Sequence, residues 1–348
     1  MKAIVFRAPN KFDMEEVPKP KCPIDGVLIK VEAVGLCGSD VRTFSFGLPG
    51  LTLPQIIGHE IAGEIVELGK NIKNYKEGER VIIDPLIHCG KCYYCKNGLE
   101  NHCKNIRVVG THIPGGYAQY VAIPGIVIKN NCIFKLDSRL SYNYAPLAET
   151  AASVINAQKN INVKKNDIVL VIGAGPIGCL HCIVAKIRGA RKVILSEINE
   201  NRLEIVKKFE NIDMMVNSSK QDLKEVVLKE TDNLGVDIVI VACPVGKVQE
   251  QALELVKCRG KVLFFGGLPK DNSYICINSN NIHYNEINIT GAYAYTPREF
   301  KEALEFITEN RIPASKFITD VLSLKDIKKG IDIVKNGLGI KVILKPWE

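Results

Sequence analysis

Four cysteines lie within a stretch of fifteen residues: Cys89, Cys92, Cys95 and Cys103. Their spacing, C-x2-C-x2-C-x7-C, lets one short irregular loop direct four sulfurs at a single tetrahedral Zn²⁺, at ~2.3 Å from each. Lys91, Lys96 and Lys104 can offset the negative charge that four thiolates leave on a divalent ion. Because four sulfurs complete the coordination of the zinc, no coordination position is left for water or substrate. We therefore expect a structural zinc lobe at residues 88–104.

The rest of the sequence indicates the cellular compartment of the protein, which decides whether clustered thiols form disulfides or bind metal. Twelve cysteines in 348 residues are far fewer than a disulfide scaffold carries. The N-terminal residues MKAIVFRAPNKF contain no long apolar segment of the kind that a secretory signal needs. The longest apolar runs have the length of strands and are too short to span a bilayer. We therefore expect a cytoplasmic protein without a membrane segment, in which clustered thiols bind metal.

A second set of metal-binding residue types is more widely spaced, with Cys37 in VGLCGSDV and His59 and Glu60 in GHEIAGEIVELG. One sulfur, one nitrogen and one oxygen ligand, with room for a fourth, are typical of a catalytic zinc. His59 and Glu60 can both reach one ion only if the chain turns sharply after Gly58. Glu149, in PLAETAAS, offers another oxygen, so the choice of third ligand stays open. The alternatives are a core thiol and a surface His-Glu pair.

A third pattern, IVLVIGAGPIG, runs from an apolar strand into Gly173, Gly175 and Gly178. A helical segment and a second strand, KVILSE, follow, and that strand ends at Glu197, nineteen residues after Gly178. Strand, glycine turn, helix and acidic residue together indicate a dinucleotide site, because the turn lets the helix N-terminus approach a pyrophosphate. Glu197 would accept hydrogen bonds from ribose hydroxyls and repel a 2′-phosphate, so we expect NAD.

The length of 348 residues and the pattern of strands predict more than one domain. Short β-rich runs at 236–243, 260–267 and 287–293 alternate with helical segments such as 246–257. This alternation is typical of a doubly wound parallel sheet covered by helices. We place this Rossmann-type domain at residues 155–290.

The flanking segments have a different character. Residues 1–154 are rich in glycine, proline and short strands, which favours a β-barrel-type domain. Residues 291–348 contain two helical patterns and the strand KVILKP, and we expect them to return to the first domain. The fold class is therefore α/β, with a β-barrel-type catalytic domain and a Rossmann domain.

The net charge of +8 raises the alternative of a nucleic-acid-binding protein with a zinc ribbon. The lysines are dispersed and form no long basic tract, and the cysteine lobe has no interleaved aromatic pattern beyond one Tyr-Tyr pair. A zinc ribbon would also not need a dinucleotide motif. We therefore expect no nucleic-acid partner, and a small molecule as the ligand.

Together these motifs identify the chain as similar to a known family. It resembles the zinc-dependent medium-chain dehydrogenases, most closely the sorbitol (L-iditol) and threonine dehydrogenase branch, over essentially its whole length. The signature G-H-E-x2-G-x5-G-x2-V begins at Gly58, with Ile72 in place of the valine, and C-G-S/T-D matches Cys37–Asp40. The resemblance implies a GroES-like catalytic domain, a Rossmann domain, one catalytic and one structural zinc, NAD, and a homo-oligomer, either a dimer or a tetramer.

The resemblance also implies roles by position. Cys37 and His59 match catalytic zinc ligands, Glu60 matches the adjacent third ligand, and Glu149 matches a glutamate beside the zinc and its water. Ser39 matches the hydroxyl of a proton relay. The residues that match or lie beside cofactor contacts are Gly173, Gly175, Pro176, Ile177, Gly178, Glu197, Arg202, Gly266, Gly267 and Tyr293.

Departures from the branch concern the substrate. Arg42 stands where the branch commonly has a histidine, and Thr43 where sorbitol dehydrogenases have a tyrosine. Their Phe-Arg-Tyr stretch reads Tyr-Ala-Tyr at 293–295. The expected reaction is NAD-dependent oxidation of a secondary alcohol in a small polyol or sugar derivative. A sugar acid, a sugar phosphate, a 2,3-diol and threonine are the alternative substrates, and a cofactor-binding sensor without turnover is the alternative function.

Overall fold

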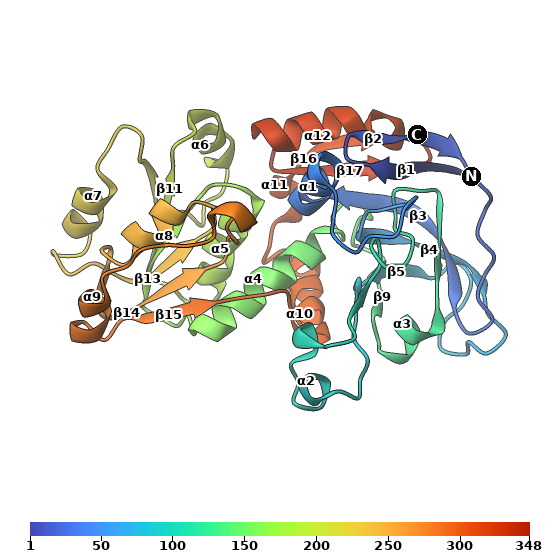
Figure 1. Ribbon diagram of the computed structural model, residues 1–348, viewed down its shortest axis with the longest axis horizontal. Helices are drawn as coiled ribbons and strands as arrows, with labels where there is room; N and C mark the ends of the chain where they lie inside the picture. Colours follow the sequence, from blue (N-terminus) through green and yellow to red (C-terminus); the bar gives the residue numbers. More distant parts are fainter. The chain divides into compact units, whose positions relative to one another are not determined.

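The computed structural model describes residues 1–348 and divides them into two compact units. Unit 1 consists of Met1–Ala152 together with Tyr295–Glu348, and unit 2 consists of Ser153–Ala294. The division falls inside helix α4 (Leu147–Ile161) (Figure 1). The C-terminal segment therefore belongs to the same unit as the N-terminal one, and unit 2 is one continuous stretch of chain.

Unit 1 is organised around a seven-stranded sheet with the order β16-β17-β3-β4-β5-β9, and β8 also pairs with β3. Its strands are β3 (Val27–Leu36), β4 (Glu60–Leu68), β5 (Arg80–Ile83), β8 (Tyr120–Ile123), β9 (Ile133–Lys135), β16 (Ile318–Ser323) and β17 (Lys341–Lys345). Strand β3 pairs with three others and is buried at eight of its ten positions, which explains its apolar sequence VLIKVEAVGL. Only β16 and β17 are parallel to each other.

The other elements of unit 1 cover this sheet or extend from it. The strands β1 and β2 form a hairpin that is joined to the rest of the unit by the bridges Ala3–Ala118 and Phe6–Gln55. The short pair β6 and β7 frames a loop that contains the four clustered cysteines. Helix α12 packs against β16 and β17 (Figure 1). The elements are β1 (Lys2–Ala8), β2 (Lys11–Glu16), α1 (Gly38–Phe46), β6 (Leu86–Ile87), α2 (Tyr93–Lys96), the 3₁₀ turn Glu100–His102, β7 (Arg107–Val108), α3 (Gly125–Lys129), α10 (Pro297–Thr308), α11 (Ala314–Phe317), the 3₁₀ turn Leu324–Asp326 and α12 (Ile327–Asn336).

Unit 2 is a parallel six-stranded sheet with the order β12-β11-β10-β13-β14-β15. Its strands are β10 (Ile168–Ile172), β11 (Lys192–Glu197), β12 (Met214–Asn217), β13 (Val236–Val241), β14 (Val256–Phe264) and β15 (Asn288–Gly291). The strand order reverses between β10 and β13, which is the position where ligands bind in sheets of this kind. Strand β10 is buried along its whole length, as its unbroken apolar sequence predicts.

Helices connect these strands, and α5 packs on β10 and β11 while α8 packs on β13 and β14 (Figure 1). They are α5 (Pro176–Ile187), α6 (Glu200–Val206), α7 (Leu223–Lys229), α8 (Gly246–Ala252), the 3₁₀ turn Lys270–Asn272 and α9 (Ser279–Tyr284). The helix expected at 246–257 ends at Ala252, because Val256 already pairs with Val236 as the start of β14. No helix of the protein combines the length and apolar character that a transmembrane span needs.

Candidate active site and metal centres

The connection between β3 and β4 brings together Cys37, His59 and Glu60, the candidate ligands of the catalytic zinc. Cys37 follows the last residue of β3 and stands at the N-terminal cap of α1, and Glu60 begins β4 opposite Gly35. Gly58 has φ of +94°, and a Cβ there would lie 2.9 Å from the ring of Tyr117. The sharp turn therefore exists, and the ligand atoms of Cys37, His59 and Glu60 all lie within 4.8 Å of one another.

Asp40 fixes the orientation of His59. Its Oδ1 lies 3.2 Å from His59 Nδ1, and its Oδ2 accepts hydrogen bonds from the Tyr117 hydroxyl at 2.7 Å and the Cys37 amide at 3.2 Å. Burial would lower the pKa of His59, but Asp40 and Cys37 outweigh it and raise the pKa well above its ordinary value. A histidine held through Nδ1 by a carboxylate presents Nε2 for a metal.

Glu60 is fully buried and its two oxygens have different surroundings. Oε1 accepts a hydrogen bond from Lys341 Nζ at 2.5 Å and another from the Thr150 hydroxyl at 3.1 Å. Oε2 has no hydrogen-bond partner, and a Cβ on Gly35 would lie 1.8 Å from it. A buried carboxylate oxygen without a donor is costly, so the residues fit a cation beside Cys37 and His59.

Glu149 lies in the first turn of α4 and stands outside the compact ligand set. Its Oε1 accepts a hydrogen bond from the Tyr295 hydroxyl at 3.2 Å. Burial raises the pKa of Glu149, with a contribution from Glu60, while His59 and Lys341 oppose the rise. The structure therefore places Glu149 as an electrostatic neighbour of the three ligands.

Helix α1, which Cys37 caps, carries three further polar residues of interest. Ser39 is half-buried, whereas Arg42, one turn further along α1, is exposed and has no ion pair. Thr43 is buried and donates a hydrogen bond to the Ser39 carbonyl. Its hydroxyl is therefore engaged within the helix, while Arg42 presents a free positive charge.

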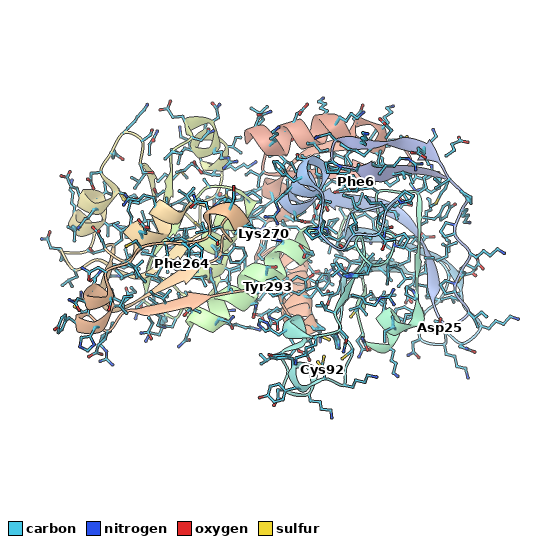
Figure 2. The ribbon with its side chains drawn as sticks, viewed as in Figure 1. Phe6, Asp25, Cys92, Phe264, Lys270 and Tyr293 are labelled. Carbon is cyan, nitrogen blue, oxygen red and sulfur yellow. The ribbon has the colours of Figure 1, made fainter.

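The four clustered cysteines form a second, separate set. Sulfur–sulfur distances are 3.9 Å for Cys89–Cys95, 3.5 Å for Cys92–Cys95 and 3.9 Å for Cys92–Cys103. These are far longer than a disulfide bond and close to the roughly 3.8 Å that tetrahedral coordination at ~2.3 Å implies. Figure 2 labels Cys92 among the sulfur atoms of this loop. Backbone amides, first that of Lys91, lower the pKa of Cys89 to about 6, whereas burial raises the pKa of Cys95 to about 12.

The glycine turn of unit 2 lies between β10 and α5. Gly173 has φ of +110°, and a Cβ on Gly178 would lie 1.8 Å from the Gly173 carbonyl oxygen. Glu197, at the end of β11, accepts hydrogen bonds from the amides of Ala174 at 2.8 Å, Ile198 at 2.9 Å and Asn199 at 3.0 Å. The acidic residue is thus tied to the turn, and Arg202 lies 3.9 Å from it.

The remaining expected cofactor residues occupy different positions in unit 2. Gly266 and Gly267 follow β14, and the Gly266 carbonyl accepts a hydrogen bond from the Gln249 side chain at 3.0 Å. Gly175 caps α5, and Pro176 and Ile177 open that helix. Tyr293, which is labelled in Figure 2, is 66% exposed and so is not part of a packed core.

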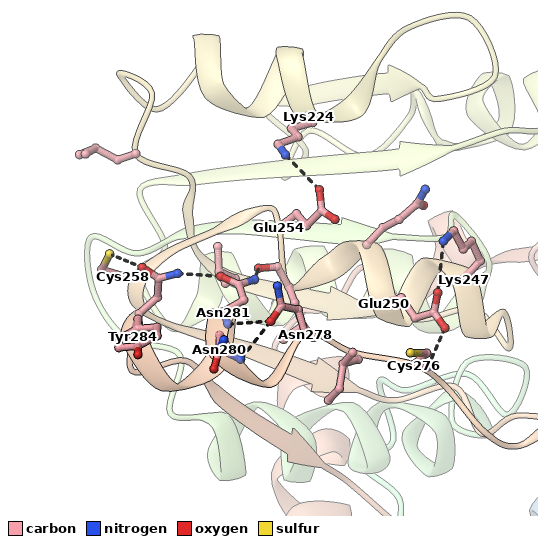
Figure 3. A pocket seen from close by; sticks show the side chains of 16 residues that line it. Lys224, Lys247, Glu250, Glu254, Cys258, Cys276, Asn278, Asn280, Asn281 and Tyr284 are labelled. Atoms are coloured by element: carbon pink, nitrogen blue, oxygen red, sulfur yellow. Dashed lines mark hydrogen bonds and ion pairs between the residues drawn. The ribbon is translucent and has the colours of Figure 1, made fainter.

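Unit 2 also has two cavities that the expected cofactor residues do not line. One, of about 450 Å³, is lined in part by Ile172 at the end of β10 and by Ile198 and Ser218, which directly follow β11 and β12. The other, of about 800 Å³, lies around α9 (Figure 3). Its charged side chains pair with each other, as Lys224 does with Glu254, and it contains none of the expected site residues.

Sequence reasoning missed several supporting residues. Asp40 and Tyr117 orient His59, and Thr150 and Lys341 hold Glu60, yet none of them was assigned a role. Asp40 had a signal, since it stands three residues after Cys37. Lys341 had only a weak one, a lysine at the start of the apolar strand KVILK, because its partner lies 281 residues earlier.

Two family models match the chain. Residues 23–138 match the alcohol dehydrogenase GroES-like domain, and residues 176–309 match the zinc-binding dehydrogenase model. The first match contains both candidate metal sets apart from Glu149, and the second begins inside the glycine turn, at Pro176, and contains Gly178, Glu197 and Arg202. The expected GroES-like and Rossmann fold is therefore confirmed.

Curated relatives extend over the whole chain. Sorbitol dehydrogenase of Halalkalibacterium halodurans is 30% identical over 350 residues, which cover 99% of this chain and 99% of the relative. L-Threonine 3-dehydrogenase of Salmonella paratyphi B is 29% identical over 352 residues and covers 100% of both chains. Enzymes acting on different alcohols are thus similar to this chain to nearly the same degree.

Solved structures agree with this assignment. The 2R,3R-butanediol dehydrogenase of Bacillus subtilis superposes with a TM-score of 0.88 at 27% identity, covering 99% of each chain. A structure from Sinorhizobium meliloti, described as a zinc-binding dehydrogenase bound to NADP, gives a TM-score of 0.90 at 27% identity, again over 99% of each chain. With its fold, its motifs and its relatives, the chain belongs to the zinc-type alcohol dehydrogenases of the medium-chain dehydrogenase/reductase family.

Proposed function

We propose that the protein oxidises a secondary alcohol of a small polyol or sugar derivative, reversibly, with NAD⁺ as hydride acceptor. The proposal assigns a catalytic zinc to Cys37, His59 and Glu60 and a structural zinc to the four clustered cysteines. One observation carries it. The Oε2 atom of buried Glu60 has no hydrogen-bond partner beside a thiol and an oriented imidazole, which is the donor set of an open zinc site.

Zinc bound there would supply Lewis acidity toward the oxygen of an alcohol. The residues of the chain would do the rest. Asp40 holds His59, Lys341 and Thr150 hold Glu60, and Ser39 would accept the hydroxyl proton as the first group of a relay. Glu149 would be the second group able to take up a proton, since its raised pKa brings it closer to neutral pH.

The preference for NAD rests on Glu197. Three backbone amides already fix its carboxylate, so its negative charge stays at the edge of the β10–α5 turn. A 2′-phosphate at this edge would meet like charge, whereas ribose hydroxyls could donate to the remaining acceptor positions. Arg202 would soften the repulsion, and a preference for NAD follows rather than exclusion of NADP.

The test is a screen of the zinc-loaded protein with NAD⁺ and NADP⁺ against sorbitol, L-iditol, 2,3-butanediol and L-threonine, with zinc measured by elemental analysis. The expected result is two zinc ions per chain and NAD⁺ reduction with at least one polyol. Reduction with none of these alcohols, in protein that holds two zinc ions, would contradict the proposal.

Arg42 favours a second candidate, the same reaction on a sugar acid or sugar phosphate. It is exposed, lacks an ion pair and lies one turn after Ser39 on α1, so it could bind an anionic group of the substrate. An aldonate and a sugar phosphate belong in the same screen. Arg42→Gln should raise KM for the anionic substrate and leave KM for a neutral polyol unchanged if this candidate is correct.

A further inference from the structure

The chain contains two Asn-Gly peptide bonds, and both lie in the same tetrapeptide, Lys-Asn-Gly-Leu, at residues 96–99 and 335–338. An Asn-Gly bond is open to spontaneous deamidation, because glycine has no side chain that would hinder its amide nitrogen. That nitrogen attacks the side-chain carbonyl carbon of the asparagine, the C–N bond of the carboxamide breaks and ammonia leaves. Water then opens the cyclic imide to aspartate or isoaspartate. Because the two tetrapeptides are identical, a difference in reactivity has to come from the structure around them.

The two asparagine side chains are held in the same way. Asn97 directly follows helix α2 and donates a hydrogen bond to the Tyr93 carbonyl at 2.8 Å. Asn336 is the last residue of α12 and donates to the Asp332 carbonyl at 2.9 Å. The carboxamide that would lose ammonia is therefore engaged at both sites, and its rotation toward the glycine nitrogen breaks a hydrogen bond.

The attacking nitrogen is engaged at both sites as well. The Gly98 N–H donates to the Cys95 carbonyl at 3.3 Å, and the Gly337 N–H donates to the Val334 carbonyl at 3.3 Å. Both glycines have positive φ, +72° and +65°, as is common where a helix ends. Deamidation at either site therefore requires the helix end to unwind, and its rate follows the population of the opened turn.

The two turns differ in what supports them. Helix α12 has ten residues and packs on β16 and β17, and Gly337 itself is buried. Helix α2 has four residues, none of them buried, and a helix of this length has little stability of its own. It is capped by Cys92 and contains Cys95, two of the four clustered cysteines. The acceptor of the Gly98 N–H is thus the carbonyl of an expected zinc ligand.

Arg298 of α10 also reaches the turn after α2. It donates to the Gly98 carbonyl at 2.6 Å and to the Glu100 carboxylate at 3.1 and 3.3 Å. Its side chain is 58% exposed, and exposed ion pairs contribute little stability. Neither contact engages the Asn97 carboxamide or the Gly98 nitrogen. The four sulfurs therefore remain the main support of this turn.

We propose that Asn97 is a deamidation site that zinc bound by the four clustered cysteines keeps unreactive, whereas packing protects Asn336 with or without metal. The inference rests on the structural zinc of the proposed function. When one ion holds the four thiolates, Cys92 and Cys95 fix α2 and with it the Cys95 carbonyl. Without the ion the turn opens, and the Gly98 nitrogen is free to attack.

Deamidation of Asn97 would change the lobe itself. Aspartate adds a negative charge two residues after Cys95, where thiolates already lie close together. Isoaspartate routes the backbone through the former side chain, so an extra carbon atom enters the chain between Cys95 and Cys103. Both products weaken the rebinding of zinc, and the loss of the metal becomes irreversible.

Peptide mass spectrometry tests the proposal, because tryptic peptides 97–104 and 336–341 report the two asparagines from one sample. Zinc-loaded protein and protein treated with EDTA are incubated side by side under reducing conditions. EDTA should raise the deamidation rate of Asn97 roughly tenfold or more, since α2 alone is marginal, and leave that of Asn336 within about twofold. Equal acceleration at both asparagines, or none at Asn97, in protein shown to hold zinc in the lobe would overturn the proposal.

A matched pair of variants gives a second readout. Asn97→Gln keeps a carboxamide but cannot form the five-membered imide, and Asn336→Gln is its control. After incubation with EDTA, zinc is added back and measured by elemental analysis. The parent and Asn336→Gln should regain less zinc than they held before, whereas Asn97→Gln should regain all of it. Equal recovery in all three proteins would show that deamidation does not block rebinding and would overturn the irreversible loss.

This inference and the proposed function can fail separately. The zinc content of Cys37→Ser reports the lobe alone, because that variant lacks a ligand of the open site. If the lobe holds zinc and the parent shows no dehydrogenase activity, the proposed function fails and the result for Asn97 still stands. If the lobe holds zinc and EDTA does not change the rate at Asn97, only this inference fails. A lobe that binds no zinc contradicts the structural site and this inference together.

Discussion

The two candidate metal sites of unit 1 are built in opposite ways. The cysteine lobe takes all its sulfurs from one loop between β6 and β7, whose helical turns are four and three residues long. The open site takes Cys37 from the start of α1 and Glu60 from the start of β4, and supports Glu60 with Thr150 of α4 and Lys341 of β17. One site depends on local spacing and the other on the assembled sheet.

The charges of the two sites differ as well. The lobe is part of a solvated loop, where water and nearby lysines can balance its thiolates. Glu60 is fully buried and its partner Lys341 is 3% exposed, so neither charge is solvated. A buried ion pair often contributes little net stability compared with apolar packing. We infer that Lys341 is present to hold Glu60 with Oε2 free, rather than to stabilise the fold.

The largest expected effect separates the two sites directly. Cys37→Ser should lower turnover below detection with little change in thermal unfolding, because it removes one ligand of the open site. Cys92→Ser should instead lower the unfolding temperature and the solubility, because four sulfurs organise the lobe. Elemental analysis should give one zinc per chain for each variant and two for the parent. If both variants lost activity and stability equally, the sites would not have separate roles. Cys258→Ser, at an exposed position, is the control.

The next effect concerns the buried ion pair. Lys341→Met should destabilise the zinc-free protein by about 3–5 kcal/mol, because it leaves the Glu60 carboxylate buried without its partner. Urea unfolding after chelation measures this. Lys328→Met is the matched control, since Lys328 forms an exposed pair with Asp13 and exposed pairs contribute little. Equal stability of the two variants would show that Glu60 does not need Lys341.

A smaller effect is expected at Ser39. Ser39→Ala should lower kcat by roughly ten- to a thousandfold, since a positioned proton-transfer group would be lost. Zinc content should not change. Ser45→Ala lies on the same helix and removes a hydroxyl that only donates to the Val41 carbonyl, so it should behave like the parent. Parent-like kcat for Ser39→Ala at every pH would exclude Ser39 from the proton path.

The smallest effect concerns the cofactor. The ratio of kcat/KM for NAD⁺ over NADP⁺ should exceed one in the parent and fall about tenfold in Glu197→Gln, which corresponds to roughly 1.4 kcal/mol. Glu200→Gln is a suitable control, because Glu200 is an exposed member of the neighbouring helix and pairs with Lys220. An unchanged ratio in Glu197→Gln would show that this carboxylate does not set the preference.

Parts of the molecule that depend on local sequence could be predicted, whereas parts that depend on distant contacts could not. The glycine turn, β10 and β11 are local patterns, and the structure contains them at the expected residues. The end of α8 was not predictable from periodicity, because the pairing of Val256 with Val236 decides it. Lys341 was not predictable either, since its importance depends on burial and on a partner distant in sequence.

The distance of 281 residues between Glu60 and Lys341 has a consequence for biosynthesis. At 5–20 residues per second, a ribosome needs roughly a quarter of a minute to a minute to make the intervening chain. Throughout this time the nascent protein carries Cys37, His59 and Glu60 without the lysine, and β3 lacks its neighbour β17. Ser153–Ala294 can meanwhile fold as a continuous unit. We expect zinc delivered early in translation to meet an incomplete site, so lasting occupancy begins only after the lysine has emerged.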